Sequence, residues 1–146
     1  VAALCLLAAL GAALSWIDTV RHVAVVPYFE RAVGGTATFG HGHGLARHLG
    51  RLDDAARAAG LTPLSAFGFA DDLCGEDLVW HDPVDLLATV LALRADPPDP
   101  ETDDDLRRVA AKLARAREQG IRVCLLLRHG NATSAQEWEV RRGTAF

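Results

Sequence analysis

The 146-residue sequence predicts an α+β domain, in which about three main helices cover one face of a small antiparallel sheet. Short runs of strand-forming residues lie near both ends of the sequence. Between them lie segments whose apolar residues recur at helical spacing. Strands at both ends of the sequence with the helices between them are typical of an α+β domain.

The first fourteen residues, Val1 to Leu14, form an uncharged stretch rich in Ala and Leu. It is shorter than the roughly 20 residues that cross a bilayer, and it lacks the basic start of a signal peptide. The sequence contains no Met. Either residues 1–14 are an upstream read-through before a single domain at 15–146, or they are a truncated signal peptide. We favour the first, and with it a cytoplasmic protein; export is the alternative.

Val20 to Val26 is rich in β-branched residues and is predicted to be a strand. Pro27 then suits the first turn of a short helix over Tyr28 to Val33. A continuous helix from Ser15 is the alternative. The segment from Gly34 to Gly44 holds five glycines in eleven residues and is predicted to be a loop.

Apolar spacing predicts an amphipathic surface helix over Leu45 to Ala59, with Gly60 as its C-terminal cap. Pro63 to Phe69 is a short apolar connector or edge strand, and residues 70–77 form an acidic loop. The clearest helix then runs from Pro83 to Arg94. Asp82 suits its N-cap and Pro83 its first position. Apolar residues at nearly every angle predict burial on more than one side.

After a proline-rich break, Thr102 and Asp105 predict a further helix that starts in capping-box style and ends at Gly120. Its predicted inner face comprises Leu106, Val109, Ala110 and Leu113. Ile121 to Leu127 is predicted to be a strand that pairs antiparallel with a strand around Glu137 to Arg141.

Several of these segments together resemble a group of small uncharacterised bacterial proteins, a domain of unknown function. The resemblance covers about Pro63 to Leu127. It rests on Leu64-Ser65-Ala66-Phe67, Trp80-His81-Asp82-Pro83 leading into Leu87-Ala88-Thr89-Val90, and Gly120-Ile121-Arg122-Val123-Cys124-Leu125-Leu126. It implies a compact α+β domain and transfers no activity or catalytic residue.

Composition limits the classes of partner. Half of the residues are apolar, 23% are charged, and the formal net charge is −4. Because the basic residues are scattered along the sequence, a nucleic-acid partner is not expected. No membrane partner is expected unless residues 1–14 act as a signal. Cys5, Cys74 and Cys124 lack metal or redox spacing, as in a reducing cytosol. The oligomeric state is not predicted.

The loop Gly40-His41-Gly42-His43-Gly44 contains the best candidates for a metal site. Two imidazoles on a flexible backbone can reach one zinc or another divalent metal ion, with acidic ligands such as Asp71 and Asp72 from the later loop. The interpretation we prefer is a Gly-rich loop whose histidines cap or precede the helix at Leu45.

Trp80-His81-Asp82 suggests a general base, in which the Asp82 carboxylate would orient the His81 imidazole. Adjacent residues rarely adopt that geometry, and capping already accounts for Asp82. We therefore expect a non-catalytic module that binds another protein, as a regulator or an immunity-type partner does. The alternative is a metal-dependent hydrolase that uses His41 and His43.

Overall fold

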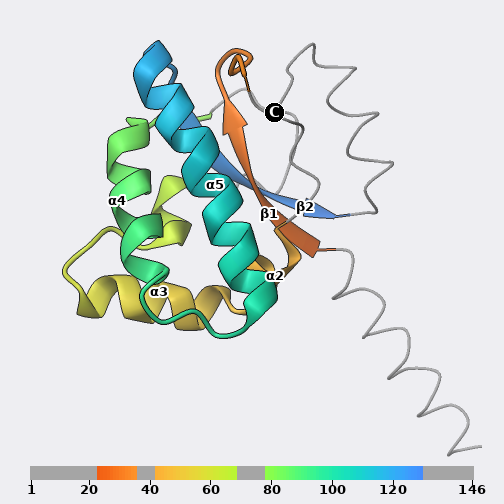
Figure 1. The fold of residues 1–146 in the computed structure, drawn as a ribbon, viewed down its shortest axis with the longest axis vertical. Coiled ribbons are helices and arrows are strands. Elements are labelled where there is room, and N and C mark those ends of the chain that lie inside the picture. The colour runs from red at the N-terminus through yellow and green to blue at the C-terminus, as the bar shows by residue number, and fades with distance from the viewer. Residues whose placement is uncertain (1–22, 36–41, 69–77, 130–146) are drawn as a thin grey trace, which may run out of the picture.

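The computed structural model describes residues 23–35, 42–68 and 78–129. Its elements in chain order are β1 (Val23–Phe29), α2 (His43–Arg47), α3 (Leu49–Ala58), η1 (Leu64–Phe67), α4 (Pro83–Leu93), α5 (Pro100–Gln119) and β2 (Val123–His129). β1 and β2 come from opposite ends of this region and form a two-stranded antiparallel sheet. Figure 1 shows the helices gathered to one side of the strand pair. The predicted α+β class is confirmed.

β1 continues through Pro27 to Phe29, so the short helix predicted over Tyr28 to Val33 is wrong. The Val25 N–H donates to the carbonyl oxygen of Gly42 at 3.0 Å and not to β2. Because Pro27 lies two residues further on, its nitrogen falls on the same edge of the strand. Proline therefore removes no hydrogen bond from the β1–β2 pair, and the β-branched and aromatic residues around it favour the strand.

The single helix predicted over Leu45 to Ala59 is also wrong, because His48 separates α2 from α3. His48 has φ −110° and ψ 18°, and its ring nitrogen Nε2 donates to the Asp99 carboxylate at 2.9 Å. A tertiary contact thus overrides a continuous helical pattern. The C-terminal cap at Gly60 is confirmed: its φ is +71°, and the Leu61 N–H donates to Ala56 at 2.9 Å. The segment after it is a connector with one 3₁₀ turn, η1.

α4 begins as predicted, with the Val84 N–H donating to Asp82 Oδ1 at 2.9 Å. α5 begins at Pro100, and its N-cap is Asp99, whose Oδ1 accepts from the Thr102 N–H at 2.7 Å. The capping box predicted from Thr102 and Asp105 is therefore wrong, because Asp99-Pro100 repeats the Asp-Pro start of α4. Gly120 ends α5 in the left-handed conformation at φ 67°, as predicted.

β2 confirms the strand predicted over Ile121 to Leu127, shifted by two residues, and its partner among the described residues is β1. The predicted partner strand at Glu137 to Arg141 lies outside the described residues, as does the stretch Val1 to Leu14. Every residue from Ala24 to Phe29 is buried, so solvent reaches neither face of β1. Within residues 23–35, 42–68 and 78–129, no helix is long and apolar enough to span a bilayer.

Candidate functional site

The end of the Gly/His loop is fastened to α5 by one buried carboxylate. Asp105 is 2% exposed, and its two oxygens accept hydrogen bonds from the backbone N–H groups of Gly42 at 3.1 Å, Gly44 at 2.9 Å and Leu45 at 3.3 Å. These donors are the start of α2, whose N-cap Gly42 has no capping side chain of its own. Asp105 therefore caps a helix about 60 positions away in the sequence. Burial raises the pKa of this carboxyl, while the three N–H groups oppose the rise.

Both described glycines of this loop are needed for close packing. Gly42 has φ +110°, and a Cβ atom there would lie 2.1 Å from the Val25 carbonyl oxygen. At Gly44 a Cβ would lie 2.7 Å from Thr102 Oγ1 and 2.9 Å from Thr102 Cα. The glycines at positions 42 and 44 are thus accounted for by close contacts with β1 and α5.

The histidines near this loop also have partners within the fold. The Nδ1 atom of His43 lies 3.0 Å from the carbonyl oxygen of Val23, and His48 bonds to Asp99. His41, Asp71 and Asp72 lie outside the described residues. Among residues that the structure does describe, no three His, Cys, Asp or Glu side chains are grouped as metal ligands would be.

His81 and Asp82 both join elements of the fold. The His81 backbone forms an isolated bridge with Val123, donating at 2.8 Å and accepting at 3.0 Å, and its ring packs edge-on against Phe67 at 5.3 Å. Asp82 caps α4. The described contacts hold no hydrogen bond or ion pair between the two side chains, so the general-base hypothesis gains no support from them.

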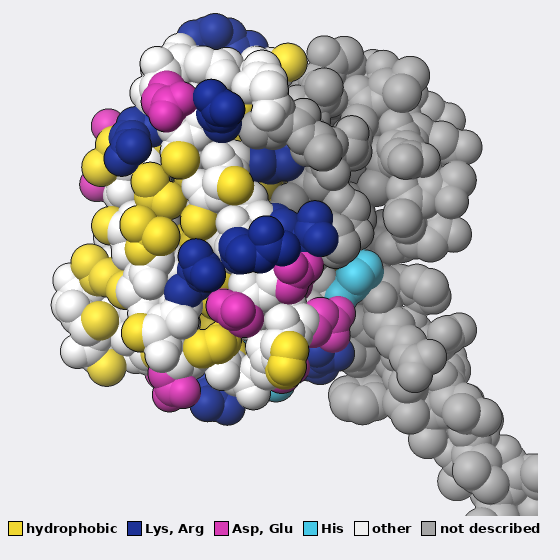
Figure 2. All heavy atoms as spheres, in the orientation of Figure 1, with side chains coloured by type: hydrophobic (Ala, Val, Ile, Leu, Met, Phe, Trp, Pro, Cys, Tyr) yellow, Lys and Arg dark blue, Asp and Glu magenta, His cyan; other side chains and the backbone are white. Residues whose placement is uncertain are grey.

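Three large apolar side chains are exposed in the described region, and two of them, Val84 and Leu91, lie on α4; the third is Val79. One face of this helix, with its extension, is exposed and apolar: Val84 is 45% and Leu91 is 52% exposed. The small residues Ala88, Ala92 and Ala95 are exposed beside them. We call these five residues the α4 face. Figure 2 shows apolar side chains gathered over this side of the molecule.

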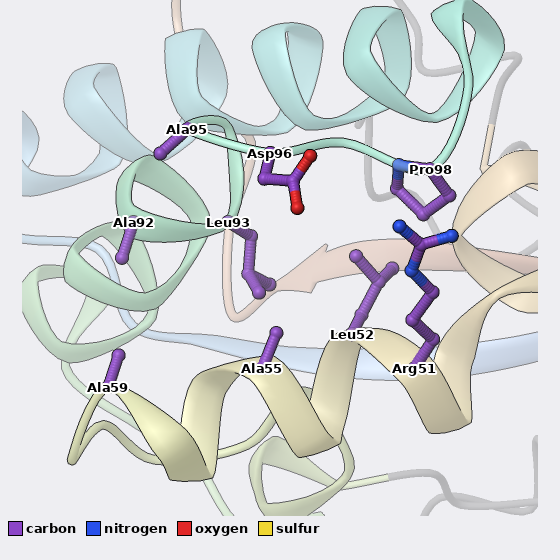
Figure 3. Close-up of a pocket in the computed structure, with 9 residues that line it drawn as sticks. All are labelled: Arg51, Leu52, Ala55, Ala59, Ala92, Leu93, Ala95, Asp96 and Pro98. Carbon is purple, nitrogen blue, oxygen red and sulfur yellow. The ribbon is translucent and has the colours of Figure 1, made fainter.

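A hollow of about 120 Å³ lies between α3 and α4, beside the α4 face. Ala55 on α3 and Ala59, the C-cap of that helix, approach Ala92 and Leu93 on α4, and the short alanine side chains leave this space (Figure 3). Arg51, Asp96 and Pro98 also line it, together with Leu52 and Ala95.

A larger cavity of about 310 Å³ lies at the N-terminal end of α4. It is lined by Asp82, Pro83, Val84, Arg117, Gly120, Ile121 and Arg122. The Arg122 Nη2 lies 2.9 Å from Glu30 Oε2, and this pairing lowers the pKa of Glu30. Val84 belongs both to this cavity and to the α4 face, so the two surfaces are continuous.

The sequence contains the signal for the α4 face, but the signal is ambiguous. Apolar residues recur there at helical spacing: Val84, Ala88, Leu91 and Ala95. Such a row predicts a contact, but it does not distinguish the protein's own core from a partner. α4 does pack against α5, α3 and η1, which confirms burial on more than one side; the remaining side is exposed. Searches of protein-family models, curated proteins and solved structures found no match to this chain.

Proposed function

We propose that this chain is a non-catalytic protein-binding module that docks its partner on the α4 face. One observation carries the proposal: five neighbouring apolar residues of one helix side are exposed, including Leu91 at 52%. Contiguous exposed apolar surface is typical of interaction sites in soluble domains. Burying a fully exposed leucine or valine side chain is worth about 1.5–3 kcal/mol. Val84 is 45% and Leu91 is 52% exposed, so a partner that covers them gains part of that free energy from each.

The shape of this surface suits a helix or another rod-like segment. Alanines separate the larger side chains along α4, and the hollow between α3 and α4 continues the surface sideways. Small residues allow a partner backbone to approach closely, and large ones supply buried area. A row of this kind accommodates the alternating side chains of an amphipathic helix.

The residues with the strongest chemical character support binding over catalysis. His43, His81 and Asp82 have partners that hold the fold together. The module is proposed to act in the cytoplasm. Cys124 is a buried free thiol, and burial raises its pKa to about 12, which keeps it unreactive.

The proposal is tested in the full chain with a photocrosslinking residue, p-benzoylphenylalanine, in place of Ala88. The same residue in place of Ala111, on the exposed side of α5, is the matched control. We expect a discrete crosslinked protein from position 88 and not from position 111. The crosslinked protein is then purified and titrated against the unmodified chain by calorimetry.

Leu91→Glu is expected to weaken that binding by roughly tenfold or more, because it places a charge where apolar contact is needed. Ala111→Glu should leave the affinity unchanged. Far-UV circular dichroism and thermal unfolding of both variants check that the fold is intact. Equal crosslinking from both positions, or an unchanged affinity for Leu91→Glu, would refute the proposed function.

A further inference from the structure

We infer that the partner anchors itself with a carboxylate, which binds Arg117 in the cavity at the N-terminal end of α4. This inference rests on the proposed function, because it supplies the chemistry of the protein that covers the α4 face. The partner segment would present apolar side chains along α4 and an Asp or Glu side chain, or a terminal carboxylate, beyond Val84.

The first argument is the charge of the cavity wall, which holds Arg117, Arg122 and the Asp82 carboxylate. Asp82 Oδ1 accepts a hydrogen bond from the Val84 N–H, and Arg122 is paired with Glu30. Most described arginines have an acidic partner within the chain; these are Arg47, Arg57, Arg94, Arg107, Arg108, Arg115 and Arg122. Arg117 lines the cavity, and no ion pair joins it to an acid in the described part of the chain. Its guanidinium is therefore available to an external acid, and guanidinium groups bind carboxylates in a bidentate manner.

The second argument is the composition of the remaining wall. Val84 is 45% exposed and lines the cavity above the buried Pro83 and Ile121, so the apolar surface that a ligand meets there is chiefly that of Val84. Val84 joins this lining to the α4 face. A ligand that fills the cavity must therefore carry an apolar portion beside its charge, as the side chains of a protein segment do.

The third argument favours a carboxylate over a phosphate. Phosphate groups at helix starts are bound chiefly by free backbone N–H groups. At α4 the first such donor, the Val84 N–H, is already bonded to Asp82 at 2.9 Å, and Pro83 has none. Arg122 is shared with Glu30. One available guanidinium matches the single charge of a carboxylate better than the double charge of a phosphate.

The test is a titration of the full chain, followed by ¹H–¹⁵N NMR, with three probes: 4-methylpentanoate, its uncharged amide and inorganic phosphate. We expect 4-methylpentanoate to shift the amide signals of Val84, Gly120 and Ile121 at millimolar concentration. The amide probe should bind about fivefold more weakly or worse, as expected for loss of a charge-assisted pair. Phosphate should shift these signals less than the carboxylate does.

Arg117→Gln is expected to weaken carboxylate binding by about fivefold, and Arg117→Lys should restore part of it. Arg115→Gln is the matched control, because Arg115 is an exposed arginine of α5 that does not line the cavity and pairs with Glu118. Absent shifts, equal binding of acid and amide, or an unaffected Arg117→Gln variant would overturn the inference, as would tighter binding of phosphate.

These outcomes separate the inference from the proposed function. If Leu91→Glu abolishes partner binding while the cavity does not bind carboxylates, the proposed docking surface is supported and the inferred acidic anchor is wrong. If the cavity binds 4-methylpentanoate through Arg117 while position 88 captures no specific protein, the proposed function fails and the cavity is a site for small apolar acids.

Discussion

Removing the Asp105 carboxylate should destabilise the fold more than removing any exposed acid. In Asp105→Ala three backbone N–H groups, at 2.9, 3.1 and 3.3 Å from the carboxylate, lose their acceptor. Hydrogen bonds to a charged group contribute about 1.5–3 kcal/mol each, but such contributions do not add, and burying the carboxylate opposes them. We therefore expect a loss of about 3–5 kcal/mol, a large part of the 5–15 kcal/mol typical of a domain.

The measurement is urea unfolding at pH 7, followed by far-UV circular dichroism. Asp105→Asn, which retains one acceptor oxygen, should lie between the wild-type chain and Asp105→Ala. Asp54→Ala is the matched control, because the Asp54 side chain is 82% exposed and its ion pair among the described residues is with Arg57, three residues away. It should change the free energy of unfolding by less than about 0.5 kcal/mol.

Hydrogen exchange localises the effect. The amides of Gly44 and Leu45 should exchange faster in Asp105→Ala, relative to global unfolding, because α2 loses its cap. A loss below about 1 kcal/mol, or one no larger than that of the Asp54 control, would refute the reasoning that Asp105 fastens the loop to α5.

Three other predictions concern packing, pH and metal. Gly44→Ala should destabilise the chain, because the new Cβ would lie 2.9 Å from the α5 backbone. Gly50→Ala places its Cβ in open space and should stabilise the chain by about 0.5–1 kcal/mol. Urea unfolding compares the two variants, and equal effects would contradict the packing argument. Side-chain hydrogen bonds from its two arginine partners lower the pKa of Asp104 to about 2. The stability that Asp104 contributes is thus present above its ordinary pKa of 3.8 and is lost as the pH falls towards 2. Asp104→Asn should therefore lower the urea midpoint at pH 5 and lower it much less at pH 2, where the folded-state carboxyl is already partly protonated. Elemental analysis of the purified chain should find no stoichiometric metal; zinc that disappears in the double variant His41→Ala/His43→Ala would instead establish the metal-site alternative.

The parts of the fold that could be predicted are those set by local chemistry. Asp82-Pro83 fixes the start of α4, and Gly60 and Gly120 end helices in the left-handed conformation. The wrong predictions concern segments whose conformation depends on residues distant in the sequence. Pro27 fits within β1 because its nitrogen lies on the strand edge that faces Gly42 and not β2. Asp105 lies on α5 but caps the N-terminus of α2. No spacing within the sequence relates such pairs.

The same limit explains why the sequence does not point to the α4 face. Imidazoles and carboxylates draw attention, yet His43 and Asp105 are used to hold β1, α2 and α5 together. The α4 face consists of residues that would suit a core equally well, and only the tertiary structure shows that Leu91 is exposed.

The α4 face and the cavity at the N-terminal end of α4 would make different contributions to recognition of a partner. In the proposed complex, the α4 face would supply affinity through the apolar area it buries, but it would not discriminate well among apolar partners. In that complex Arg117 would supply discrimination, because a partner that covers it without an acid would leave a desolvated guanidinium unpaired. Reversing the charge of Arg117 should therefore alter the choice of partner. Its effect on that choice should be larger than the effect of substituting Ala92. If Arg117→Glu selected the same partner as the wild-type chain with the same affinity, recognition would reside in the α4 face alone.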